Sequence, residues 1–118
     1  MGSEPAIIHH NPRCGKSRLT LSLLRARGIE PRIVEYLNTP PSASELGALL
    51  NKLGLEPRQL LRKGEPAYLA ERLDDPALSR AQLIAAMVKH PILIERPIVV
   101  RGRKAALGRP PEAVLALF

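Results

Sequence analysis

The order of apolar segments at the start of the chain constrains the fold more than any other feature. Ala6-Ile7-Ile8 is a short apolar run typical of a strand, and residues 17–27 carry leucines at mostly helical spacing before Gly28. Residues 31–37 (PRIVEYL) are rich in β-branched and aromatic side chains and predict a second strand. A strand–helix–strand unit implies a parallel strand pair joined by a right-handed crossover.

The middle of the chain predicts helices. Ser42 lies three residues before Glu45, and Ser79 lies three residues before Gln82. This spacing is the capping-box pattern that begins a helix. We expect helices from these serines to Leu53 and to about His90, with shorter helical pieces at residues 57–61 and 67–73.

The end of the chain predicts a β-hairpin and a closing helix. Residues 98–100 and 104–107 are the expected strands, with a hairpin tip at 101–103, and Pro110 or Pro111 begins a helix to Leu117. The whole sequence therefore predicts an α/β fold, a small mixed sheet flanked by helices. A helical insertion at about 42–91 separates its N-terminal β-α-β unit from its C-terminal β-β-α unit. With 118 residues, we expect a single domain over 1–118.

Cysteine content excludes some kinds of site. Cys14 is the single cysteine, so neither an intramolecular disulfide nor a multi-cysteine zinc site can form, and we expect no bound metal or other cofactor. The sequence shows no secretory signal pattern and no apolar run of roughly 20 residues. We therefore expect a cytoplasmic protein with no membrane partner, in a compartment where thiols stay reduced.

The positive charge of the chain does not predict a nucleic-acid partner. Eighteen Lys and Arg against eleven Asp and Glu give a net charge of +7. The acid-free basic segments, residues 5–29 and 96–111, contain no aromatic side chains on which bases could stack. Most of the basic residues are arginines, whose planar fork suits small oxyanions.

Cys14 is a candidate nucleophile. It lies between the first predicted strand and the first predicted helix, and a thiol at a helix start ionises more readily. Arg13, Lys16 and Arg18 are expected to favour the thiolate further. The alternative is a buried structural cysteine.

Two polar neighbours bear on the same thiol. Ser17 completes a Cys-x-x-Ser arrangement and cannot resolve a disulfide, so reduction requires an outside thiol. His10 can orient an anion or a water near the thiolate, and the alternative is a plain solvated histidine.

Three arginines lie at predicted boundaries between elements. Arg62 ends a short helix, Arg96 precedes a strand, and Arg109 precedes the last helix. If the fold brings them together above the thiol, their charge allows an oxyanion to approach a thiolate.

These motifs together resemble the glutaredoxin-coupled arsenate reductases over nearly the whole chain, from about Ile7 to Leu117. The resemblance rests on His10-Asn-Pro-x-Cys14-Gly-x-Ser17-Arg18, Leu60-Leu-Arg62-Lys63, His90-Pro-Ile-Leu-Ile with Arg96-Pro-Ile-Val-Val, and Gly108-Arg109-Pro110.

The resemblance implies a thioredoxin-like fold with a helical insertion, and a chemistry. Cys14 would attack arsenate to form a covalent thiol–arsenate adduct, with glutathione as co-substrate and glutaredoxin as the partner that collects the mixed disulfide as arsenite leaves. By position, Arg62, Arg96 and Arg109 would bind the oxyanion.

The resemblance also assigns supporting roles. His10, Ser17 and Arg18 would tune the thiolate or contact the substrate, and Pro97 would be the cis proline beside the active cysteine. Glu95 departs from the familiar pattern, because a carboxylate beside Arg96 can compete with an anion.

Two alternatives share the same architecture. One is a glutathione-dependent thiol transferase, for which arsenate is incidental. The other is a non-enzymatic regulator of the Spx type, which binds RNA polymerase, although a lone cysteine cannot form the disulfide switch of such regulators.

Overall fold

The computed structural model describes residues 5–118, so the first four residues of the predicted domain lie outside the described part. The described chain divides into two compact units, one formed by residues 5–39 and 96–118 and the other by residues 40–95. All the helices expected between residues 42 and 91 belong to the second unit.

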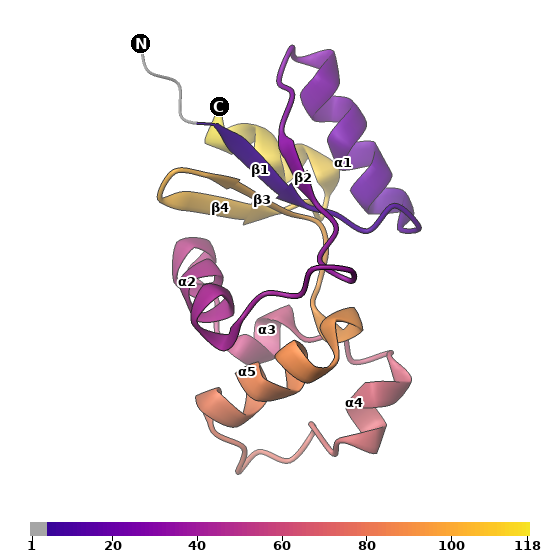
Figure 1. Ribbon diagram of the computed structural model, residues 1–118, viewed down its shortest axis with the longest axis vertical. Helices are drawn as coiled ribbons and strands as arrows, with labels where there is room; N and C mark the ends of the chain where they lie inside the picture. The colour runs from indigo at the N-terminus through magenta and orange to yellow at the C-terminus, as the bar shows by residue number, and fades with distance from the viewer. Residues whose placement is uncertain (1–4) are drawn as a thin grey trace. The chain divides into compact units, whose positions relative to one another are not determined.

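The first unit contains a four-stranded sheet in the order β2-β1-β3-β4 (Figure 1). Its strands are β1 (Ala6–His9), β2 (Arg32–Val34), β3 (Ile98–Arg101) and β4 (Lys104–Leu107). Strand β1 pairs parallel with β2 and antiparallel with β3, and β3 pairs antiparallel with β4. The predicted mixed sheet, with a parallel pair from the β-α-β unit and an antiparallel hairpin, is confirmed.

The core of this unit lies between the sheet and two helices, α1 (Gly15–Ala26) and the 3-10 helix η2 (Pro111–Leu117), which contact each other. Alternation along β1 and β3 directs one face of each strand toward these helices. The fully or nearly fully buried cluster comprises Ile8, Leu21, Leu24, Val99 and Val114.

The second unit is helical, with α2 (Ala43–Leu53), α3 (Pro57–Leu60), α4 (Pro66–Ala70), α5 (Arg80–Lys89) and the 3-10 helix η1 (Pro91–Leu93). Both predicted capping boxes are present. The side chain of Ser42 accepts a hydrogen bond from the backbone amide of Glu45, and the side chain of Ser79 accepts one from the backbone amide of Gln82. Helix α5 contacts α2, α3 and η1.

Two of the predicted elements begin or end at other residues than expected, and a third has another helical form. The second strand ends at Val34 rather than Leu37, because the amides of Asn38 and Thr39 both donate to the carbonyl of Glu35 and turn the chain. Helix α1 begins at Gly15, since the carbonyl of Cys14 already accepts from the amide of Arg18. The closing helix has the tighter 3-10 form.

Candidate active site

The segment between β1 and α1 is held by its own hydrogen bonds. The backbone carbonyl of Asn11 accepts a hydrogen bond from the amide of Cys14 at 3.0 Å. The side-chain oxygen Oδ1 of Asn11 accepts another from the amide of Arg13 at 3.0 Å. The guanidinium of Arg18 donates to the carbonyl of Pro12 at 2.9 Å. These bonds fix the backbone that presents Cys14, and Arg18 supports the loop from its outer side, where both residues are exposed.

Cys14 is the N-cap residue of α1, and its side chain is half-buried. The backbone N–H groups of Ser17 and Lys16 and the guanidinium of Arg96 act as nearby donors that lower the pKa of its thiol, although the side chain makes no capping hydrogen bond to the helix. Burial is the largest single influence and raises the pKa of Cys14, but these donors and the charge of Arg96 outweigh it. The net effect lowers the pKa of the Cys14 thiol below its ordinary value, which confirms the predicted direction.

The source of this stabilisation differs from the sequence-based expectation. The cation that lowers the pKa of the Cys14 thiol is Arg96, a buried residue at the entrance to β3, rather than the flanking side chains of Arg13 and Arg18. Lys16 contributes through its backbone N–H. The free N–H groups of the first helical turn thus act on the sulfur as expected, and the sheet supplies the charge.

His10 and Ser17 form a buried pair behind the thiol. The Nδ1 atom of His10 lies 2.6 Å from the hydroxyl of Ser17, which also accepts from the amide of Asn11 at 3.1 Å. Burial lowers the pKa of His10, and Arg25 and Arg18 lower it further against the opposing effect of Glu35. A solvated His10 is therefore the wrong alternative.

Arg96 and Arg109 are brought together at the end of the hairpin. The Nε of Arg109 donates to the carbonyl of Arg96 at 3.0 Å, and the amide of Gly108 donates to the carbonyl of Pro97 at 3.0 Å. The Arg96–Pro97 bond is cis, as the family resemblance implied, and Arg109–Pro110 is also cis.

Gly108 permits this close approach. A Cβ atom at position 108 would lie 2.5 Å from the hydroxyl oxygen of Thr20 and 2.7 Å from the ring of Pro97. Any side chain at this position would therefore push the strand that leads to Arg109 away from Arg96.

Arg62 belongs to the second unit, where two carboxylates contact it. Its Nη1 lies 2.6 Å from Glu95 and its Nε lies 3.4 Å from Glu65. Burial opposes the charge of Arg62, but the two carboxylates outweigh it and raise the pKa of the guanidinium. The convergence of Arg62 with Cys14 stays a prediction.

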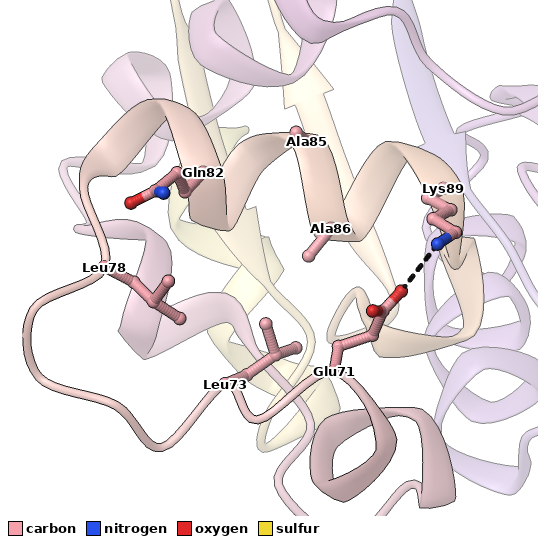
Figure 2. A pocket seen from close by; sticks show the side chains of 7 residues that line it. All are labelled: Glu71, Leu73, Leu78, Gln82, Ala85, Ala86 and Lys89. Carbon is pink, nitrogen blue, oxygen red and sulfur yellow. Dashed lines mark ion pairs between the residues drawn. The ribbon is translucent and has the colours of Figure 1, made fainter.

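The second unit also has an open cavity of about 230 Å³ (Figure 2). Leu73, Leu78, Ala85 and Ala86 give it an apolar lining, and Glu71 pairs with Lys89 at its edge at 3.0 Å. None of the predicted site residues lines this cavity.

The side chains and helices of residues 5–118 also bear on metal binding and membrane crossing. Within this range, no group of three or more His, Cys, Asp or Glu side chains is arranged to hold a metal ion. No helix in the described chain has the length and apolar character to cross a membrane.

Sequence reasoning did not assign a role to three residues that shape this site. Asn11 stabilises the loop by accepting two hydrogen bonds from its backbone. The Asn-Pro pair, which is typical of a turn, was the sequence signal that could have identified this role. Gly108 clears space for Pro97, a contact that has no local sequence signal, whereas the contact of Glu65 with Arg62 joins residues three positions apart, and that spacing was the available signal.

Comparison with known proteins identifies a family and relatives that match nearly the whole chain. Residues 9–117 match the model of the ArsC family. The uncharacterized protein YfgD of Escherichia coli (strain K12) is 52% identical over 111 residues, which cover 93% of each chain. An arsenate reductase of Neisseria meningitidis serogroup A is 50% identical over 112 residues, 94% of this chain and 96% of the relative.

A solved structure gives the same result in three dimensions. The arsenate reductase from Vibrio cholerae superposes with a TM-score of 0.96 at 48% identity, covering 99% of this chain and 100% of that one. The thioredoxin-like fold implied by the motifs is therefore confirmed. The half-buried cysteine at the start of α1, the family match over residues 9–117 and these full-length similarities lead to one conclusion: the chain belongs to the ArsC family.

Proposed function

We propose that this protein is an oxidoreductase that reduces arsenate to arsenite, with Cys14 as the nucleophile. The observation that carries the proposal is the half-buried Cys14 at the N-cap of α1, where nearby backbone N–H groups and the guanidinium of Arg96 lower the pKa of its thiol. They favour the thiolate, which is the reactive form of cysteine. The names of the full-length relatives support arsenate as the substrate.

The first step is a displacement at arsenic. The thiolate of Cys14 forms a bond to arsenic, and one arsenic–oxygen bond breaks, with the departing oxygen protonated to water. Both reactants are anions, so the step needs positive charge beside the sulfur. Arg96 provides it, and Arg109, bonded to the carbonyl of Arg96, is the adjacent oxyanion ligand in this proposal. By family resemblance, Arg62 contributes the third guanidinium.

The second step requires an external thiol, because Cys14 is the single cysteine of the chain. Glutathione attacks the adduct at the Cys14 sulfur, and the electron pair of the sulfur–arsenic bond passes to arsenic. Arsenic(V) becomes arsenic(III) and leaves as arsenite, while Cys14 is left as a mixed disulfide with glutathione. Glutaredoxin then reduces this disulfide, a sequence that fits the reducing cytosol.

The test is a coupled assay. The protein is incubated with arsenate, glutathione, glutaredoxin and NADPH in the presence of glutathione reductase, and arsenate-dependent NADPH loss is followed. We expect activity that Cys14→Ser abolishes and that Ser22→Ala, an exposed position on α1, retains. Absence of arsenate-dependent NADPH loss in the unaltered protein would refute the proposal.

The same assay separates the two alternative functions. Turnover of a glutathione mixed disulfide together with indifference to arsenate would identify a thiol transferase. Recovery of RNA polymerase subunits in a pull-down, without either activity, would identify a regulator of the Spx type.

A further inference from the structure

The surroundings of Arg62 are unusual for a residue expected to bind an anion. The Nη1 atom of Arg62 lies 2.6 Å from a carboxylate oxygen of Glu95, and its Nε lies 3.4 Å from a carboxylate oxygen of Glu65. All three side chains are part-buried, with 24%, 21% and 23% of the side chain exposed for Arg62, Glu95 and Glu65. Two of the three nitrogens of this guanidinium, Nε and Nη1, therefore contact carboxylates of the chain itself.

Two carboxylates contact the single guanidinium of Arg62, at 2.6 Å from Glu95 and 3.4 Å from Glu65. A tetrahedral dianion that approaches Arg62 meets repulsion as well as attraction, unless one carboxylate withdraws.

We propose that Glu95 is a specificity-determining residue that occupies Arg62 in place of the oxyanion and weakens its binding. The inference deepens the proposed function and rests on it in taking Arg62 as an oxyanion ligand. A carboxylate matches the guanidinium fork in the same planar way as two oxygens of an oxyanion, so the two compete for the same N–H groups. An oxyanion binds at Arg62 when it displaces Glu95.

Glu95 is a stronger competitor than Glu65 for geometric reasons. The contact of 2.6 Å is at the short end for a charge-assisted hydrogen bond, whereas 3.4 Å is near the outer limit. Glu65 also lies three residues after Arg62, and side-chain pairs at this spacing stabilise a chain only weakly. The amide of Glu95 is fixed by its hydrogen bond to the carbonyl of Leu60 at 2.8 Å, which positions the carboxylate beside Arg62.

The test measures oxyanion binding without turnover. Isothermal titration calorimetry with sulfate, a tetrahedral dianion, is performed at fixed pH and ionic strength. We expect Glu95→Gln, which keeps the shape and removes the charge, to tighten sulfate binding about five- to tenfold, as a single close charge contact in a solvated setting would. Glu65→Gln should tighten it less, and Asp74→Asn, an exposed acid of the same unit, should change it less than twofold.

A double-mutant cycle shows whether the gain acts through Arg62. In an Arg62→Ala background, adding Glu95→Gln should no longer tighten sulfate binding. In arsenate turnover, Glu95→Gln should lower KM more than it changes kcat, a split that a purely structural role would not produce. If Glu95→Gln prevents folding, Glu95→Asp tests the same point, because the shorter carboxylate recedes from Arg62 and should also tighten binding.

The following results would overturn the inference: sulfate binding unchanged or weakened by Glu95→Gln, a gain equal to that of Asp74→Asn, or a gain that persists without Arg62. Tighter sulfate binding in a protein that does not reduce arsenate would refute the proposed function and support the role of Glu95. Normal arsenate reduction with unchanged sulfate binding would do the reverse.

Discussion

Replacement of Gly108 by alanine tests how the site is assembled. The added Cβ would lie 2.5 Å from the Thr20 hydroxyl oxygen, 2.7 Å from Cγ of Pro97 and 3.1 Å from its Cδ. Neither Thr20 nor Pro97 can move away from the added Cβ easily. Thr20 is fully buried and donates to the carbonyl of Lys16 at 2.8 Å, and the ring of Pro97 is buried at the entrance to β3.

The expected cost follows from overpacking. Inserting a methyl group into a well-packed site typically costs about 1–3 kcal/mol, and two contacts below 3.0 Å place Gly108→Ala in the upper half of that range. For a chain of this size, about 2 kcal/mol corresponds to a fall in Tm of roughly 8 °C. The shift of the backbone should also move Arg109 from the carbonyl of Arg96 and lower kcat/KM for arsenate by about tenfold or more.

The measurement is thermal and urea unfolding of two matched glycine variants. Gly47 lies inside α2, and a Cβ there meets no atom within 4 Å. Gly47→Ala should therefore stabilise the protein by about 0.5–1 kcal/mol through helix propensity. If Gly108→Ala unfolds within about 0.5 kcal/mol of the unaltered protein, the argument from close packing is refuted.

Three further predictions concern the loop and its thiol. The alkylation rate of Cys14 should rise with pH around a midpoint below the ordinary thiol pKa of about 8.5. Arg96→Ala should move this midpoint upward, and an unmoved midpoint would contradict the role given to Arg96. Ser17→Ala should lower the unfolding free energy by about 1–3 kcal/mol, because the buried amide of Asn11 loses its acceptor, and a cost below that of exposed Ser22→Ala would refute this reading. The pKa of His10 is lower in the folded than in the unfolded state. Its contribution to stability is therefore present above about pH 6.5 and is lost as pH falls through the folded-state pKa. The free energy of unfolding, measured in urea at a series of pH values, should decline toward acid, and His10→Gln should reduce this decline.

Features that depend on residues three or four positions apart could be predicted from the sequence. The capping boxes at Ser42 and Ser79 are of this kind, as is the position of Cys14 at a helix start, where free backbone N–H groups favour a thiolate. The strand pattern also predicted the mixed sheet. The capping boxes and the helix start were accessible because the bonding partners are close in the sequence and their spacing is fixed by helix geometry, whereas the sheet followed from the order of the strands and the handedness of the crossover.

Other features required the tertiary structure. Arg96 acts on the thiol because β3 pairs with β1, and Gly108 is needed because β4 returns the chain against Pro97 and Thr20. No local pattern specifies such contacts, since they depend on which strands pair and on how closely the backbones approach. The sequence by itself determined the helices, the strands and the exposed start of α1, whereas tertiary packing decided which of many arginines supplies the charge beside the thiol.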